Sequence, residues 1–371
     1  MPIKGRVRCL PLVRKPRPAA FCKPTCYWMR LESRANVPIS GIMKWLNHKL
    51  YIEPIDCYID PVRPVPRAII THGHADHARA GHRYVLATQQ TIDIMQARYG
   101  AKCAGHFQSL SFGEPLKIDD VTVTLHPAGH ILRSAQVCLE YRGQRAVITG
   151  DYKTQADSTS QHFELVQCDL FVTEATFGLP VFQHPKPLDE IQQLLASIAA
   201  KTDRCHVIGA YALGKAQRVI KLLRESGYDA PIYLHGAQEK LCAYYASQGV
   251  HLGDLRKALD SVKDSFRGHV VIAPPSALRD RWSRRLPDPV VCNASGWMTI
   301  KQRAKQRGVE LPLVISDHAD WNELTKTIIA TGAETIWVTH GREDALVHWC
   351  RQRGLDAEPL YLQGREEDST E

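Results

Sequence analysis

Short apolar runs alternate with segments of helical period along most of the chain from residue 43 onward, and this pattern predicts an α/β fold. Residues 187–200 and 212–226 carry apolar side chains on one helical face. Later helices are expected at 323–331 and 344–352. Mixed or antiparallel pairing is expected for the closely spaced early strands, which are predicted at 50–55, 67–71, 84–87, 121–125, 136–141 and 145–149.

A second alternation of strands and helices lies between residues 181 and 311 and indicates an inserted α/β domain. Pro185 and Pro187 mark its beginning. One domain is therefore expected to form in two parts, 43–180 and 312–371, on either side of the insertion. The segments predicted inside the insertion are 205–209, 212–226, 231–234, 236–248 and 269–273.

Five apolar runs are each followed at once by His, Asp or Glu. Such continuous runs are typical of strands buried on both faces. Polar side chains at their carboxyl ends should converge on one rim of a sheet, where α/β folds place their chemistry. The runs are 68–71 before His72, 147–150 before Asp151, 170–173 before Glu174, 313–316 before Asp317 and His318, and 336–339 before His340.

Charge and cysteine content indicate the cellular compartment of the protein but do not identify its substrate. Residues 1–42 hold nine Lys and Arg and one acid, so the totals of 47 and 39 leave 38 of each sign for the remainder. The net charge of +8 therefore belongs to the tail and is no evidence that the core binds nucleic acid. Eleven scattered cysteines indicate reduced thiols of a cytoplasmic protein, and no apolar run is long enough to span a membrane.

The Pro-rich, basic segment 1–42 predicts a disordered tail. It could serve as a nucleic-acid arm or as an organellar transit segment. Translation beginning at Met43 is the third alternative, in which the upstream residues reflect a misassigned start.

The segment from Thr71 to His77 carries the strongest chemical signal, because it holds three imidazoles and a carboxylate in six residues. Zinc prefers such nitrogen and oxygen ligands at about 2.0–2.2 Å. The small residues Gly73 and Ala75 let alternate side chains face one metal ion while the following pair faces another. The segment therefore predicts a metal site rather than a polar turn.

Two later residues, His130 after Gly129 and Asp151 after Gly150, extend this signal. Either alone would be weak, because a single His beyond a strand is more often structural. In this order the series resembles the metal-binding residues of the metallo-β-lactamase fold, an αββα sandwich. The resemblance implies two Zn²⁺ ions, with Mn²⁺ as an alternative. It also implies that one ion is bound by His72, His74 and His130, that the other is bound by Asp76 and His77, and that Asp151 bridges both.

Three further residues resemble the additional motifs of the β-CASP nucleases, a family built on this fold: Glu174, His318 and His340. An inserted cap domain separates the first two of these motifs in the family, and residues 181–311 fall there. The resemblance covers nearly all of 43–371 and extends to the ligase-associated DNA exonucleases of bacteria. It implies that His340 completes the second metal site. It also implies an ATP-dependent DNA ligase and a helicase as partners.

The residue types support phosphodiester hydrolysis as well. Two metal ions about 3.5–4 Å apart lower the pKa of a bridging water, hold phosphate oxygens and stabilise an in-line transition state. The leaving oxygen then needs a proton, which an imidazole supplies well near neutral pH. The resemblance assigns this role to His318, with Glu174 orienting that imidazole and Asp76 among the catalytic residues.

Contacts to substrate phosphates are predicted for basic residues near these ligands or interleaved with Trp282. For the cluster around Trp282, a solvated loop is an equally good interpretation. Arg133 also departs from the family, which commonly carries Gly in that loop. The predicted contacts are Arg133, Lys153, Lys215, Arg281, Arg284, Arg285 and Arg342.

These residues predict a dizinc DNA exonuclease that acts in DNA repair. An RNA-processing nuclease is the first alternative, because RNA-directed β-CASP members carry His at the position of His340. A small-molecule metallohydrolase would cleave a thioester but no oligonucleotide. A nucleic-acid-binding protein with a degenerate site would bind without turnover.

Overall fold

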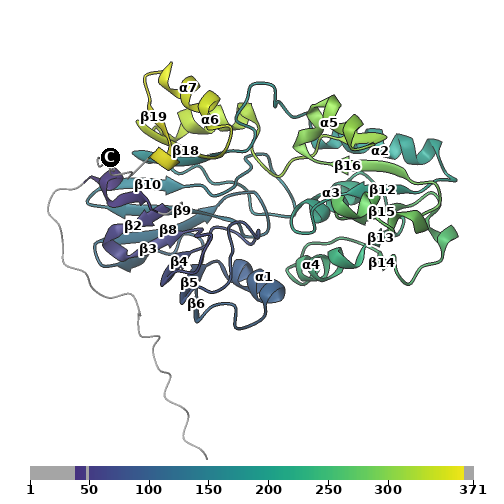
Figure 1. Ribbon diagram of the computed structural model, residues 1–371, viewed down its shortest axis with the longest axis horizontal. Helices are drawn as coiled ribbons and strands as arrows, with labels where there is room; N and C mark the ends of the chain where they lie inside the picture. Colours follow the sequence, from purple (N-terminus) through teal and green to yellow (C-terminus); the bar gives the residue numbers. More distant parts are fainter. Residues whose placement is uncertain (1–37, 47–49, 363–371) are drawn as a thin grey trace, which may run out of the picture.

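The structure is a computed structural model that describes residues 38–46 and 50–362. Figure 1 shows two lobes: the chain before about residue 180 and after about residue 315 forms one, and the residues between form the other. No helix among the described residues is both long and apolar enough to cross a bilayer.

The first sheet contains six strands in chain order. Its first three strands pair antiparallel and the rest pair parallel, as the predicted mixed pairing requires. The strands are β1 (Met43–Trp45), β2 (Leu50–Ile52), β3 (Cys57–Ile59), β4 (Arg67–Ile69), β5 (Tyr84–Ala87) and β6 (His106–Ser109).

The second sheet contains seven strands in the order β19-β18-β11-β10-β9-β8-β7. Strands β7 to β10 form an antiparallel meander, and β10, β11, β18 and β19 pair parallel. The strands are β7 (Leu116–Ile118), β8 (Val121–Pro127), β9 (Ala135–Tyr141), β10 (Gln144–Ile148), β11 (Leu170–Ala175), β18 (Thr335–Gly341) and β19 (Asp356–Pro359).

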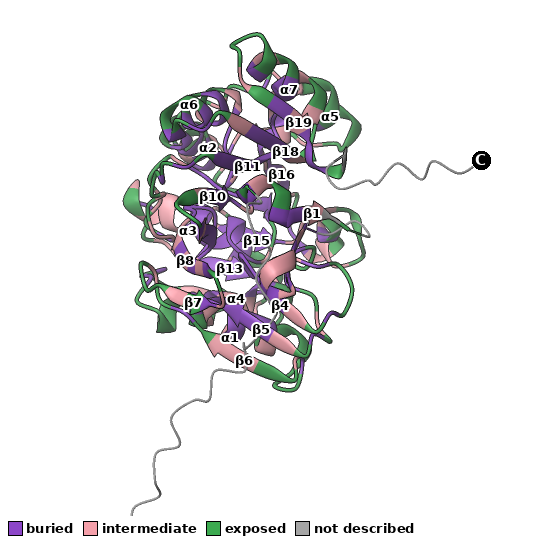
Figure 2. Cartoon of the chain, turned by 90° about the vertical axis from the view of Figure 1, so that its left-hand side faces the viewer, coloured by how far each residue is buried: buried purple, intermediate pink, exposed green. Residues whose placement is uncertain are grey.

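These two sheets pack face to face and give the inner layers of an αββα sandwich. Alternation in β8 turns Val121, Val123 and Leu125 into the core between the sheets, where they meet Ile52 and Ile69. Strand β11 is buried on both faces, because helices cover its other side. Figure 2 shows β11 and the middle of β18 in the colour of buried residues. The outer helices are α1 (Gln89–Tyr99) on the first sheet and α6 (Trp321–Thr331) and α7 (Glu343–Arg351) on the second.

The second lobe is the inserted α/β domain. Its six strands are all parallel, in the order β14-β13-β15-β12-β16-β17. The strands are β12 (His206–Gly209), β13 (Ile232–Leu234), β14 (Leu255–Lys257), β15 (Val270–Ala273), β16 (Val290–Ala294) and β17 (Leu311–Leu313). The helices are α2 (Pro187–Ala200), α3 (Lys215–Glu225), α4 (Gly236–Ser247) and α5 (Lys301–Gln306).

The fold class expected from the sequence, an αββα sandwich with an inserted α/β cap, is confirmed. Helix α2 begins and ends where its apolar period predicted. Helix α3 begins at Lys215 rather than 212, because Gly214 adopts φ 84° and ends the preceding turn. Strand β17 pairs with β16, so we propose that the cap extends to residue 313 rather than 311.

Single-turn 3₁₀ helices connect many of these elements, and the first of them corrects the predicted tail. The sequence predicts disorder for residues 1–42, of which 1–37 lie outside the described residues, yet Ile39 and Ile42 are buried in the core between the sheets. One short turn has too few residues to show an apolar period. The 3₁₀ helices are η1 (Ile39–Ile42), η2 (Glu53–Ile55), η3 (Lys263–Phe266), η4 (Pro275–Arg279), η5 (Ser283–Arg285), η6 (Gly296–Thr299) and η7 (Leu360–Leu362).

Candidate metal centre

The polar residues that follow the five apolar runs do converge, but from three sheets rather than along one rim. This corrects the sequence prediction, because the five runs look alike locally and only tertiary pairing assigns each to a sheet. His72 follows β4 of the first sheet, and His318 lies beyond β17 of the cap sheet. The second sheet contributes Asp151 after β10, Glu174 in β11 and His340 in β18.

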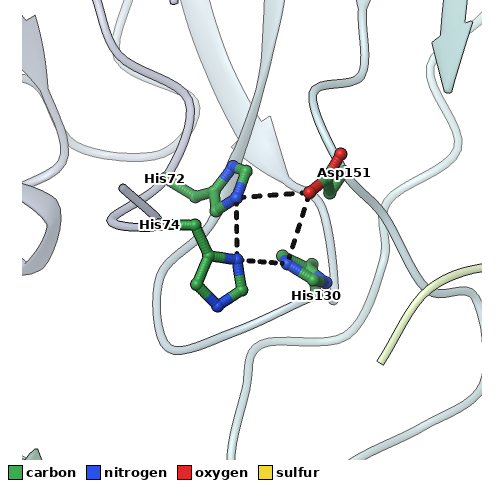
Figure 3. A group of neighbouring side chains, drawn as sticks. All are labelled: His72, His74, His130 and Asp151. Carbon is green, nitrogen blue, oxygen red and sulfur yellow. Dashed lines mark hydrogen bonds and ion pairs between the residues drawn. The ribbon is translucent and has the colours of Figure 1, made fainter. Parts of the chain in front are cut away.

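Four of the predicted ligands form a compact group around the end of β4 (Figure 3). His74 Nδ1 lies 3.1 Å from His72 Nε2 and 3.0 Å from His130 Nε2. Asp151 Oδ2 lies 3.4 Å from His72 Nε2 and 3.7 Å from His130 Nε2. His72 and His130 are buried and His74 is partly buried, so the four side chains present their donor atoms to one another.

Each of these three imidazole rings has an outward nitrogen, the one that points away from the other rings. An oxygen partner of this nitrogen fixes the tautomer of the ring. His74 Nε2 donates to the Leu213 carbonyl at 3.1 Å, and His130 Nδ1 donates to the Asp317 carbonyl at 2.7 Å. His72 Nδ1 lies 3.0 Å from the Thr71 hydroxyl, which itself donates to a carboxylate. The three nitrogens that face one another therefore carry lone pairs. Burial lowers the pKa of all three histidines, that of His130 to about 3, which keeps them neutral.

Gly150 lets Asp151 reach this group. Its φ is 56°, and a Cβ there would lie 2.6 Å from Thr71 Oγ1. A residue with a side chain would therefore be strained and would collide with Thr71. The Thr-Gly-Asp sequence thus sets the turn that places the carboxylate between the histidines.

A second group overlaps the first through Asp151. His77 Nε2 lies 3.4 Å from Asp151 Oδ2, and the His340 ring stacks on the His77 ring at a centroid distance of 4.8 Å. Asp76 is more peripheral, because its carboxylate is 3.9 Å from His77 Nε2 and its side chain is 69% exposed. The structure therefore brings the predicted second-site residues together, with Asp76 and His340 on the solvent side.

Asp60 belongs to this site and was missed by the sequence analysis. It lies just beyond β3, and its carboxylate accepts from His77 Nδ1 at 2.8 Å and from the backbone and hydroxyl of Thr71 at 2.8 and 2.5 Å. The signal was present, since Asp60 follows the apolar run Tyr58-Ile59 as the other site residues follow theirs. The run is too short to stand out.

The charges around the second group favour a cation. Burial would lower the pKa of His77, but the carboxylates of Asp151 and Asp60 raise it well above its ordinary value. Burial would likewise raise the pKa of Asp151, but the charges of His77 and His318 hold it well below its usual range. The Asp151 carboxylate thus retains its negative charge inside the protein and can balance the charge of a bound cation.

His318 and Glu174 form a hydrogen-bonded pair at the rim of the site. His318 Nδ1 donates to Glu174 Oε2 at 3.0 Å, and Glu174 is fully buried and also accepts from the Tyr152 backbone at 2.7 Å. Burial opposes the charged imidazole, but Glu174 and Asp151 raise the pKa of His318 to about 9. The pair can therefore hold a proton on His318 at neutral pH.

The two lobes enclose a pocket of about 830 Å³ in front of these residues. The sandwich contributes His74, Asp151 and His340 to its lining. The cap contributes Tyr211, a residue that is 64% exposed. Arg342 also lines the pocket with an exposed side chain.

Two of the predicted phosphate contacts have other partners. The Lys153 ammonium, 3% exposed, forms an ion pair with Glu323, and the Lys215 ammonium is 2.6 Å from Asp317. We therefore do not propose phosphate contacts for them. Arg133 lies over the Phe112 ring, and Arg285 donates to the Leu259 carbonyl. Of the seven predicted contacts, the pocket lining includes only Lys215 and Arg342, and leaves out Arg281 and Arg284.

The donor set fits divalent metal ions. Lone pairs of three neutral imidazoles face one carboxylate, and within the described residues His77 Nε2 is buried without a hydrogen-bond partner. A cluster of acceptors without a proton between them is unfavourable unless a cation binds. Imidazole and carboxylate ligands suit Zn²⁺, and the carboxylates also suit Mn²⁺.

Comparison with known proteins supports the resemblance, although no family model matches the sequence. A protein of Opitutus terrae named "Probable DNA ligase" is 31% identical over 323 residues, which are 85% of this chain and 31% of that protein. An RNase J-like protein of Methanocaldococcus jannaschii is 25% identical and covers 50% of this chain and 51% of its own length. The endoribonuclease YSH1 of Gibberella zeae is 31% identical over 46% of this chain and 20% of its own.

The chain thus spans about half or less of the length of these relatives. Two of these relatives are named for ribonuclease activity. The chain belongs to the β-CASP family of the metallo-β-lactamase fold.

Proposed function

We propose that this protein is a metal-dependent nuclease that hydrolyses phosphodiester bonds. The observation that carries the proposal is the joint placement of the metal-binding groups, the His318–Glu174 pair and Arg342 around one pocket between the lobes. A phosphodiester needs cations for its oxygens and a proton for its leaving oxygen, and this pocket has groups for both.

Two divalent ions, Zn²⁺ or Mn²⁺, are proposed as the cofactors. His72, His74 and His130 would hold one ion, Asp76, His77 and His340 the other, and Asp151 both. When bound, the ions would supply an activated water and positive charge beside the phosphate oxygens. The protein's own contribution is orientation, because Asp60, Leu213 and Asp317 each accept a hydrogen bond from the outward nitrogen of one imidazole.

His318 is proposed to protonate the leaving oxygen. Its Nδ1 is occupied by Glu174, so its Nε2 is the nitrogen left to transfer a proton in the pocket. The buried Glu174 carboxylate favours the protonated ring and holds its orientation. Tyr211 and Arg342 would contact the base and the phosphate backbone of a single strand, respectively.

DNA is the proposed substrate and exonucleolytic DNA repair the proposed role. The support comes from relatives, because the Opitutus protein is named for DNA ligase. A protein of Acidianus ambivalens described as "in lig 3'region" is 29% identical over 129 residues, 89% of its length. We accordingly propose an ATP-dependent DNA ligase, and by resemblance a helicase, as partners of this protein.

RNA processing is the second candidate, and the names of the RNase J-like protein and of YSH1 favour it. Matched single-stranded DNA and RNA oligonucleotides, labelled at either end, separate the two in the presence of Zn²⁺ or Mn²⁺. Stepwise shortening of DNA from one end would support the proposal and give its polarity. Preferential cleavage of RNA would support the second candidate.

Two variants make this assay specific. Asp151→Ala removes the carboxylate shared by both groups and should abolish cleavage. His126→Ala removes a histidine that pairs with Glu164 outside the site and should leave cleavage unchanged. Activity that survives in Asp151→Ala would reject the proposed centre. Hydrolysis of a thioester but of neither oligonucleotide would point to a small-molecule metallohydrolase.

A further inference from the structure

Two of the proposed metal ligands donate to backbone carbonyls, one in the cap and one in the segment that leaves it. The Leu213 carbonyl, which accepts from His74, lies between β12 and α3 of the cap. The Asp317 carbonyl, which accepts from His130, lies in the segment that returns from β17 to the sandwich. The orientation of these imidazoles therefore depends on where the cap sits.

Lys215 ties these two stretches of chain together. It is the first residue of α3, and its ammonium donates to Asp317 Oδ1 at 2.6 Å and to the Ile315 carbonyl at 3.1 Å. The side chains of Lys215 and Asp317 are only 5% and 7% exposed. The sequence suggested a phosphate contact for Lys215, but this ammonium is already paired with the return segment.

A buried ion pair is weak evidence for stability, because removing two charges from water costs about as much as their attraction returns. Such a pair is better suited to fixing a geometry. Here Lys215 connects the turn that carries the Leu213 carbonyl with the segment that carries the Asp317 carbonyl. A single side chain thus keeps both acceptors in register with His74 and His130.

The cap backbone also lies close to a sandwich side chain beside this pair. Gly214 has a φ of 84°, and a Cβ there would lie 2.3 Å from Ile131 Cγ2. The Tyr245 hydroxyl of α4 accepts from the Leu132 backbone at 3.1 Å. The loop that follows His130 therefore rests directly on the cap, with no room for a side chain at position 214.

We propose that Lys215 is a positioning residue of the metal centre, which holds the cap turn and the return segment against His74 and His130 so that cap docking sets metal affinity. The proposal rests on the proposed metal centre but on no particular substrate. According to the proposal, the cap orients two metal ligands in addition to forming one wall of the pocket.

Metal affinity is the measurement that tests the proposal. The full-length protein is stripped of metal and titrated with Zn²⁺ against a chromophoric chelator, and Co²⁺ is added separately to record its visible absorption spectrum. Lys215→Met should bind Zn²⁺ about 10- to 100-fold more weakly, the range found when groups that orient a metal ligand are removed. Its Co²⁺ spectrum should also change, because two imidazoles lose their fixed orientation.

The single variant leaves the Asp317 carboxylate buried without its partner, so the fold itself could suffer. The double variant Lys215→Met/Asp317→Asn removes both charges, and its metal-free unfolding midpoint should return close to that of the unaltered protein. Its Zn²⁺ affinity should stay reduced, since a methionine side chain has no N–H to donate to the Ile315 carbonyl or to residue 317. Lys221→Met is the matched control on the same helix, because Lys221 forms an ion pair with Glu225, one turn further along α3.

Gly214→Ala tests the same idea without altering any charge. The added methyl group should push the cap turn away from Ile131 and weaken Zn²⁺ binding in the same direction. Unchanged Zn²⁺ affinity in both Gly214→Ala and the double variant would overturn the proposal. If Zn²⁺ fails to bind the unaltered protein, the metal centre itself is rejected, whereas normal binding with insensitive variants rejects only the role of Lys215.

Discussion

Replacing Tyr211 by alanine should weaken the binding of single-stranded oligonucleotides without disturbing the fold. The Tyr211 ring lies on the cap wall of the pocket and is largely exposed. Its loss should therefore change the free energy of unfolding by no more than about 0.5 kcal/mol. Stacking of one base on an aromatic ring contributes about 1–3 kcal/mol. Its loss corresponds to a rise of about 5- to 150-fold in KM.

The assay follows cleavage of a fluorescent single strand by the unaltered protein, Tyr211→Ala and Tyr211→Phe. The Phe variant retains the ring and should keep a near-normal KM, whereas kcat should change little in either variant. A series of substrates, each with one abasic nucleotide at a different distance from the cleaved bond, locates the stacked base. At one position the abasic substitution should raise KM for the unaltered protein but not for Tyr211→Ala.

Two results would refute this reasoning. The first is an unchanged KM for Tyr211→Ala, which would mean that no base rests on the ring. The second is a variant that remains as sensitive as the unaltered protein to the abasic substitution at every position. Cleavage of the oligonucleotide would in both cases leave the proposed nuclease activity intact.

Four further predictions concern the fold and the site. Glu174→Gln should lower kcat about 10- to 100-fold with little change in KM, because His318 loses the carboxylate that orients it. An unaltered kcat would contradict this prediction. A chelator should lower the thermal unfolding midpoint, since an ion at 100 times its Kd contributes about 2.7 kcal/mol to stability. Burial lowers the pKa of His184 to about 4, so its contribution to stability is complete above pH 6.5 and declines as the pH falls towards 4. His184→Leu should therefore flatten urea-unfolding stability over that pH range by up to about 3 kcal/mol. A chain that starts at Met43 should have a free energy of unfolding about 3–6 kcal/mol lower than one that starts at residue 38, because each of the two buried Ile residues of η1 contributes about 1.5–3 kcal/mol. Equal urea midpoints for the two chains would argue against η1 as part of the core.

The sequence was sufficient for the parts of this protein that local patterns encode. The His-Gly-His-Ala-Asp-His segment holds its ligand types within one loop, so its chemistry is legible without any long-range contact. Helix α2 was predicted to the residue, because Pro187 and a regular apolar period define it. Eight of the thirteen described sandwich strands were predicted, because a strand with one buried face alternates and one with two buried faces is continuous. The short strands β1, β3, β6, β7 and β19 were not predicted.

Only the tertiary structure decided which sheet each strand joins and what lies behind each imidazole. The apolar run 313–316 resembles the run that becomes β18, yet only Leu313 of it lies in a strand, and that strand, β17, pairs with β16 in the cap. The acceptor for His74 is the Leu213 carbonyl, 139 residues away, and every residue type carries the same carbonyl. A hydrogen bond to a backbone carbonyl places no requirement on the side chain of the accepting residue. A buried lysine cannot be distinguished from an exposed one in the sequence, because its ion-pair partner is not known there. The acceptor that orients His74 is for this reason decided by the docked cap, while the types of the proposed metal ligands can be read from the sequence.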